Sequence, residues 1–161
     1  MMRGLKIILV IFVALQALLY AAQNIANIEA AYVFVSAVLT MADHTAYPAH
    51  FGPPIASPAL IWAALWVIIA AELLTGALGL LGAFSMISAN RASPEQFAAS
   101  CKFAIMSCGM SLVVWFGFFM VIGGGYFQMW QTPLGGASFN GAFQYALGPA
   151  AVLVFLNTPE R

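Results

Sequence analysis

Residues 58–88 read PALIWAALWVIIAAELLTGALGLLGAFSMIS, and this stretch decides the class of fold. It contains a single charged side chain, Glu72, among aliphatic, aromatic and small residues. A helix needs about 20 apolar residues to cross the hydrocarbon core of a bilayer. Pro58 suits the first turn of a helix, where the N–H that proline lacks would be unpaired. The stretch therefore predicts a membrane-spanning helix over 58–88.

Three further apolar runs lie on either side of it, at about 5–23, 97–122 and 141–156. The segments between the runs are rich in Pro, Gly and polar residues, which are typical of connections. Pro159 follows the last run and ends it. We expect an all-α fold: an integral membrane four-helix bundle in a single membrane domain, 1–161.

The segment from about 25 to 40 is a helix of another kind. Its apolar residues recur at helical spacing, with polar residues off that stripe, which predicts an amphipathic helix. The apolar positions are Ile28, Tyr32, Val35 and Leu39. It either lies in the membrane interface on the outer side or forms a fifth span.

The basic residues favour four spans. The chain has five Lys and Arg residues, which are Arg3, Lys6, Arg91, Lys102 and Arg161. With four spans all five lie on one side, whereas a fifth span would separate Arg91 and Lys102 from Arg3. Loops rich in Lys and Arg stay on the cytoplasmic side. We therefore expect a multi-pass protein of the cell inner membrane with both termini cytoplasmic.

The first run resembles a signal peptide in its basic start and apolar middle. Leu19 and Tyr20 fit the small-residue rule of a cleavage site poorly, however. We therefore expect the run to remain as a span, with a cleaved signal as the alternative.

The composition excludes several classes of protein. Of 161 residues, 63% are hydrophobic and only 6% are charged, whereas a soluble domain carries roughly 25% charged residues. The predicted surface therefore contacts lipid. The formal net charge is zero, and a nucleic-acid partner needs a basic patch. We expect the lipid bilayer as the main partner and no nucleic acid.

Glu72 is the first candidate for a functional residue. An acidic side chain at the centre of a span costs at least about 2.5 kcal/mol, so it should face the interior of the bundle. We group it with other polar residues predicted inside the spans, namely Gln16, Thr75 and Ser111. The group is either a polar clasp between helices or a proton or ion relay. The clasp is favoured because a relay usually needs several ionisable groups.

Three glycines, Gly76, Gly79 and Gly82, share the predicted helix with Glu72. Small residues let helices approach closely in membranes. We expect these glycines to serve helix packing, not phosphate binding, since phosphate-binding glycines lie between a strand and a helix.

Two histidines, His44 and His50, fall in the Pro-rich outer loop beside Met41 and Asp43. They could ligate a metal, but a site needs three or four converging ligands. We expect a solvated loop and no cofactor, and keep a metal at His44 and His50 as the alternative. The sequence shows no Ser–His–Asp order and no paired carboxylates, so we do not expect an enzyme.

Several motifs together resemble a family of small bacterial integral membrane proteins known only as domain of unknown function 2165. They include Glu72 with Thr75 and Gly76, and the most specific cluster, Met129-Trp130-Gln131. The others are Val38-Leu39-Thr40-Met41, Ile68-Ile69, Trp115-Phe116, Gly117, Phe119-Met120, Gly123-Gly124, Tyr126-Phe127 and Asn140-Gly141. The resemblance covers nearly the whole chain and implies a membrane location. Gly125 departs from it, because the family tends to have an acidic residue there.

The function expected from the sequence is that of an accessory or structural subunit. Small size and an outer aromatic loop favour a place in a larger complex with other membrane-protein subunits, for example a respiratory or photosynthetic one. Aromatic residues are favoured at interfaces, so the candidate partner interface is Tyr126, Phe127, Met129, Trp130 and Gln131. The alternative is a small transporter or channel that uses Glu72.

Overall fold

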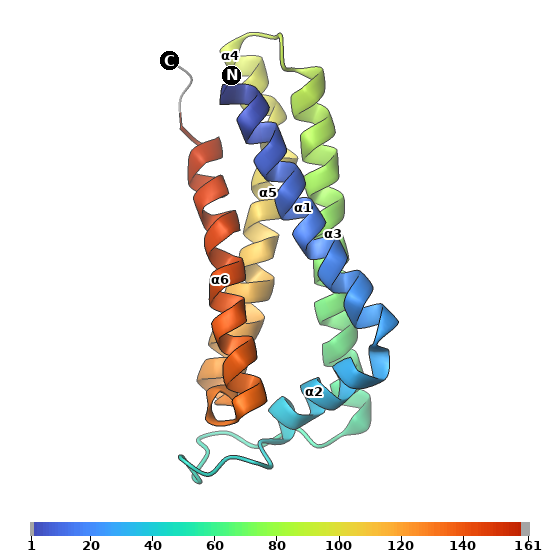
Figure 1. Cartoon of the computed structure of the whole chain (residues 1–161), viewed down its shortest axis with the longest axis vertical. Helices are drawn as coiled ribbons and strands as arrows, with labels where there is room; N and C mark the ends of the chain where they lie inside the picture. Colours follow the sequence, from blue (N-terminus) through green and yellow to red (C-terminus); the bar gives the residue numbers. More distant parts are fainter. Residues whose placement is uncertain (1, 159–161) are drawn as a thin grey trace.

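The computed structural model describes residues 2–158, and every regular element in that range is a helix. Four helices are long and apolar enough to cross a membrane. They are α1 (Met2–Ala26), α3 (Pro58–Ser88), a composite helix (Pro94–Tyr126) and α6 (Pro133–Leu156). This confirms the all-helical four-span architecture (Figure 1). Pro159 and Arg161, used in the sequence argument, lie outside the described residues.

The composite helix has three parts: α4 (Pro94–Ser100), α5 (Lys102–Leu112) and η1 (Val113–Tyr126). It begins with a capping box, in which Ser93 Oγ accepts from the backbone N–H of Gln96 and the Gln96 side chain accepts from the backbone N–H of Ser93. Such reciprocal bonds satisfy two of the unpaired N–H groups of a helix start. The last part, η1, is a π-helix.

The fourth span begins earlier than the sequence predicts. The pattern indicates a loop to residue 140, but α6 starts at Pro133. Thr132 caps it, its Oγ1 accepting a hydrogen bond from Gly135 N at 3.0 Å, and Pro133 occupies the first turn. Gly135 and Gly136 are typical of a turn, whereas here they form the first turns of a helix. The added turns make α6 long enough to span.

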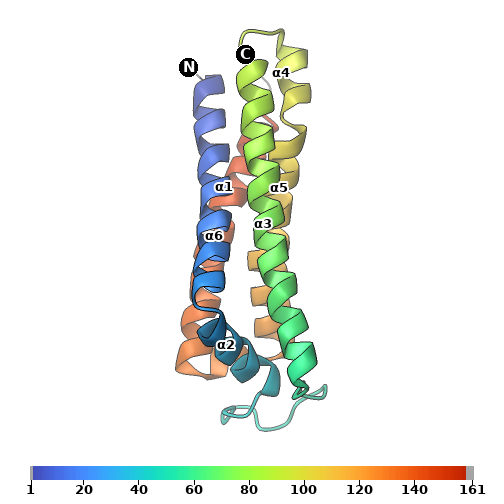
Figure 2. The same cartoon turned by 90° about the vertical axis from the view of Figure 1, so that its right-hand side faces the viewer.

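The four spans form a ring in which α1 packs against α3, α3 against α5, and α6 against α5, η1 and α1. Figures 1 and 2 show the four long helices running side by side. Gly79 and Gly82 lie where α3 meets its neighbours. A Cβ on Gly79 would lie 2.6 Å from Ala14 Cβ, and one on Gly82 would lie 2.5 Å from the backbone nitrogen of Ala104. Gly76 similarly faces Leu18.

One end of the bundle, the terminal end, gathers residues 2–6, 89–102 and 156–158. Arg3 Nη1 donates to the carbonyl oxygens of Asn90 and Ala92, both at 2.8 Å. Lys6 Nζ donates to Leu156 O at 3.3 Å and Thr158 O at 3.0 Å. The four basic residues in the described range therefore lie at one end of the molecule.

The opposite end, the loop end, comprises α2 (Ile28–Thr40), residues 41–57 and residues 127–132. With 13 residues, α2 is roughly 20 Å long, too short to cross a hydrocarbon core of about 30 Å. Figure 1 shows it lying obliquely across the end of the bundle. The loop 41–57 is folded onto this end, since Ile55 N donates to Leu39 O at 2.8 Å and Tyr47 N donates to Gln131 Oε1 at 2.7 Å.

Candidate functional site

Glu72 lies near the middle of α3 and points into the bundle. Its side chain is only 1% exposed. Oε2 accepts a hydrogen bond at 3.0 Å from Nδ2 of Asn24, in the last turn of α1. Oε1 is buried and has no hydrogen-bond partner among the described residues. A buried polar atom without a partner is costly, so this oxygen marks the site.

A cavity of about 340 Å³ lies beside Glu72. Its walls come from all four spans and α2, and five of the eleven lining residues are aromatic. They comprise Tyr20, Asn24, Phe34, Glu72, Trp115, Phe119, Ala137, Ser138, Gly141, Ala142 and Tyr145. The cavity therefore combines one carboxylate with aromatic and small residues, and we call it the Glu72 cavity.

Three of its aromatic rings form a mutual cluster. The Tyr20 ring centroid lies 5.0 Å from that of Trp115 and 4.8 Å from that of Tyr145. The Trp115 and Tyr145 centroids are 5.3 Å apart, in an edge-to-face arrangement. Such geometry is favourable for aromatic pairs. The cluster joins α1, η1 and α6 at the depth of Glu72.

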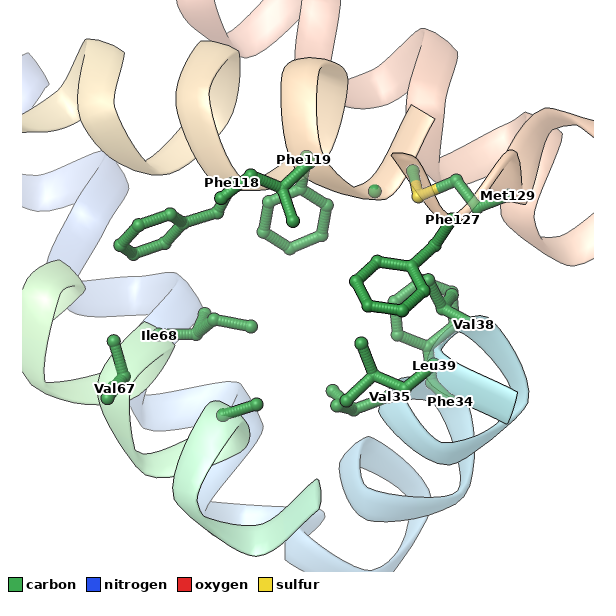
Figure 3. A pocket seen from close by; sticks show the side chains of 13 residues that line it. Phe34, Val35, Val38, Leu39, Val67, Ile68, Phe118, Phe119, Phe127 and Met129 are labelled. Carbon is green, nitrogen blue, oxygen red and sulfur yellow. The ribbon is translucent and has the colours of Figure 1, made fainter. Parts of the chain in front are cut away.

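A second cavity, of about 250 Å³, shares Phe34 and Phe119 with the Glu72 cavity. Every residue lining it is apolar. Figure 3 shows Phe118 and Phe119 on one side, Val67 and Ile68 on another, and Phe34, Val35, Val38 and Leu39 of α2 closing the space near Phe127 and Met129. We call it the apolar cavity.

The chain matches a known family whose description agrees with the membrane-spanning fold. A family described as "Predicted small integral membrane protein (DUF2165)" matches residues 2–159. The chain belongs to this family. No curated protein and no solved structure gives a match to the chain.

The other polar residues grouped with Glu72 serve different contacts in this DUF2165 protein. Gln16 Nε2 donates to Tyr145 O at 3.2 Å, which links α1 to α6. Thr75 Oγ1 donates within its own helix, to Ala71 O at 2.7 Å. Ser111 is buried in α5. A related link, unforeseen from the sequence, joins α5 to α3, where Ser107 Oγ donates to Thr75 O at 2.7 Å.

The candidate partner interface of the DUF2165 chain is only partly at the surface. Phe127 and Met129 are 5% and 2% exposed and line the apolar cavity. Their burial takes them away from a partner, because α2 and loop 41–57 cover this end. Trp130 is 40% exposed and packs edge-to-face on Tyr47. Tyr126 and Gln131 are half-buried.

His44 and His50 come together in the folded loop, with ring centroids 5.7 Å apart. Both ring nitrogens of His44 and Nδ1 of His50 are buried without a hydrogen-bond partner in the described chain. These nitrogens are thus more shielded from solvent than those of a solvated loop would be. In residues 2–158 no group of three or more His, Cys, Asp or Glu side chains converges on one point.

The sequence indicates Glu72 but not its surroundings. Asn24 falls beyond the predicted first span because the apolar run ends near residue 23, whereas α1 continues to Ala26. Trp115 and Phe119 are four residues apart, which places them on one side of a helix. Which side faces Glu72 is settled only by the packing of the four spans.

Proposed function

We propose that this DUF2165 protein is an accessory subunit of a larger protein complex in the bacterial inner membrane, without catalysis of its own. The supporting observation is an open groove of about 360 Å³ on the third span. It is lined by apolar residues and two glycines, which are Gly109, Leu112, Val113, Phe116, Gly117, Phe118, Val121 and Ile122. We call it the glycine groove.

The chain itself shows how such a surface is used. On α3, Gly79 and Gly82 allow α1 and α5 to approach closely, so that a Cβ would meet neighbouring atoms. On α5, a Cβ at Gly109 would meet nothing within 4 Å. Small residues in membrane helices favour close helix–helix contact. The groove therefore fits an apolar transmembrane helix of another subunit, and partly exposed Trp130 near the same span offers an anchor.

We also propose that the terminal end of the bundle faces the cytoplasm. The terminal end holds Arg3, Lys6, Arg91 and Lys102. By the positive-inside rule, these residues favour a cytoplasmic location for that end. We propose no catalytic step. Glu72 is the buried acid of the described chain, and it contacts an amide and not a second acid or base.

The test is co-purification from native membranes. Tagged protein extracted in a mild detergent should elute with a stoichiometric partner, identified by mass spectrometry. Gly109→Leu would fill the groove and should abolish co-purification. Gly148→Leu is the matched control, because Gly148 is exposed on α6 and a Cβ there would meet nothing within 4 Å, and it should retain the partner. Elution of the wild-type protein alone, or only as a homo-oligomer, would contradict the proposal.

The second candidate function is a small transporter or channel that uses Glu72. The cavity beside its unpartnered oxygen favours this reading. Glu72→Gln should then abolish proton or substrate flux in proteoliposomes, and unchanged flux would exclude it.

A further inference from the structure

The Glu72 cavity combines features that suit one kind of ligand. Glu72 lines it, and Oε1 of this carboxylate is buried without a hydrogen-bond partner among the described residues. The cavity volume of about 340 Å³ falls within the range of sites for drug-sized molecules. Five of the other ten lining residues are aromatic. A ligand should therefore satisfy a carboxylate and aromatic rings together.

The described basic residues cannot neutralise Glu72. Arg3 and Lys6 bind backbone carbonyls at the terminal end, and Arg91 and Lys102 belong to that end as well. Between Glu72 and Ser88, where α3 ends, the helix rises by about 24 Å. An ionised carboxylate at this depth requires a nearby positive charge, and the cavity leaves room for one.

The aromatic walls favour a cation over a neutral or anionic head group. Tyr20, Trp115 and Tyr145 surround the cavity at the depth of Glu72. Aromatic faces attract a desolvated cation, and Trp does so most strongly. Quaternary ammonium groups are bound in this way in aromatic cages. An anion would be repelled by Glu72, and no described Lys, Arg or His lines the cavity.

Two neighbouring cavities suit the same ligand, one for its apolar part and one as its entrance. The apolar cavity adjoins the Glu72 cavity at Phe34 and Phe119 and can hold hydrocarbon groups. A third cavity, of about 490 Å³, opens at the loop end and shares Phe34 with both. Asp43 lies on its wall, and an acidic side chain at an entrance attracts cations.

We propose that the Glu72 cavity is a binding site for a lipophilic monocation, such as an apolar quaternary ammonium or a hydrophobic amine. Ionised Glu72 binds the positive group, and the rings of Trp115, Tyr20 and Tyr145 contact it. The apolar cavity holds the hydrocarbon substituents of the ligand. Asn24 is a positioning residue, because its bond occupies Oε2 and leaves Oε1 without a partner among the described residues. This site is independent of the accessory-subunit proposal and does not require that the ligand be transported.

The test uses two probes of nearly the same shape and opposite charge. Radiolabelled tetraphenylphosphonium is bound to the purified full-length protein in detergent by equilibrium dialysis. Unlabelled tetraphenylphosphonium should displace it, whereas neutral triphenylphosphine oxide should not. Tetraphenylborate, dialysed alone in a parallel experiment, should show no saturable binding. The absence of saturable binding of the cation, equal displacement by the neutral compound, or equally tight binding of the borate alone would overturn the proposal.

Variants then locate the site. Glu72→Gln keeps the shape and a partner for Asn24 but removes the charge, so binding should weaken by at least about tenfold. Trp115→Phe keeps an aromatic ring but weakens the attraction for a cation, and a loss of about threefold or more is expected. The matched control is Thr75→Val, one turn from Glu72, fully buried and outside the cavity lining; it should bind as the wild type does.

Folding of each variant is checked by helical circular dichroism and by elution as a single species. If Glu72→Gln does not fold, two single variants replace it, Glu72→Asp and Trp115→Phe. The aspartate keeps the negative charge but withdraws it from the cavity. Wild-type affinity in folded Glu72→Gln, or in both replacement variants, would overturn the assignment. None of these results affects the co-purification test, so the two proposals fail separately.

Discussion

Lys6 illustrates how single polar residues tie the ends of the spans together. It is 4% exposed, and its ammonium group lies under the last turn of α6, bound to two carbonyl oxygens. The final carbonyls of a helix have no partner within the helix, and a cation there also interacts favourably with the helix dipole. Lys6 therefore acts as a cap supplied by another helix.

Lys6→Met should destabilise the protein by about 1–3 kcal/mol, because it leaves buried carbonyl groups without their charged donor. The free energy of unfolding in mixed micelles measures this. Lys102→Met is the control, since Lys102 is exposed at the same end, and it should change stability by less than about 0.5 kcal/mol. Equal effects of the two substitutions would contradict the capping role.

His44 gives the loop end a dependence on pH. Burial lowers the pKa of His44, and the nearby His50 lowers it further, while Asp43 acts in the opposite direction. The unfolded loop binds a proton more tightly than the folded loop, so acid favours unfolding. The stability of the loop end should be complete above about pH 6.5, the ordinary pKa of histidine, and should fall as the pH falls below it.

This is measured by the thermal unfolding midpoint at about pH 7.5 and about pH 5. The wild type should lose stability at the lower pH, and His44→Gln should lose less. A decrease that is just as large in His44→Gln would assign the effect to other groups.

At the scale of the helices, α3 is the element on which the packing depends. Gly82 faces the backbone of α5, where a Cβ would lie 2.5 Å from Ala104 N and 2.8 Å from Ala104 Cα. Backbone atoms cannot move aside as a flexible side chain can. Gly82→Ala should therefore separate α3 from α5 at a cost of about 1–3 kcal/mol.

Gly109→Ala provides the comparison for this prediction. Gly109 lies in the interior of α5 with open space around it, so alanine should be neutral or stabilise the helix by about 0.5–1 kcal/mol. Unfolding in mixed micelles measures both variants. If Gly82→Ala is as stable as Gly109→Ala, the close contact of α3 and α5 is not what the glycine serves.

The sequence predicts most elements and some of their limits. The bounds 58–88 agree with α3 because Pro58 and a polar turn delimit the run. The predicted start of α6 is wrong because Gly135 and Gly136 normally indicate a turn, while the cap at Thr132 outweighs them. The π-helix of η1 leaves no sign in the pattern of apolar residues.

For the whole molecule, the positive-inside rule predicts which end of the bundle faces the cytoplasm. If the terminal end is cytoplasmic, Thr45→Cys at the loop end should react with a membrane-impermeant maleimide on spheroplasts. Glu95→Cys at the terminal end should react only after permeabilisation. Both positions are exposed, and both native cysteines, Cys101 and Cys108, are buried. The reverse pattern would overturn the orientation derived from the basic residues.

The candidate site could be predicted only in part, for a reason that applies to the whole bundle. Glu72 stands out because it is a charge in an apolar run. Asn24, Trp115 and Tyr145 do not stand out, because the side of a span that faces lipid is as apolar as the side that faces its neighbours. In a soluble bundle the polar side would have shown which faces meet, and here only the packed structure shows it.

The π-helix of η1 affects how this protein can diverge. Phe127 N donates to Ile122 O, five residues back, at 3.0 Å, so a turn here contains more residues than an α-helical turn. Trp115, Phe119 and Gly123, spaced by four, all line cavities. A π-turn holds about one residue more than an α-turn, so deleting one residue and restoring an α-helical turn would leave the chain beyond it facing nearly the same direction. Relatives could thus differ by one residue in chain length here, while the span and the faces that line the cavities persist.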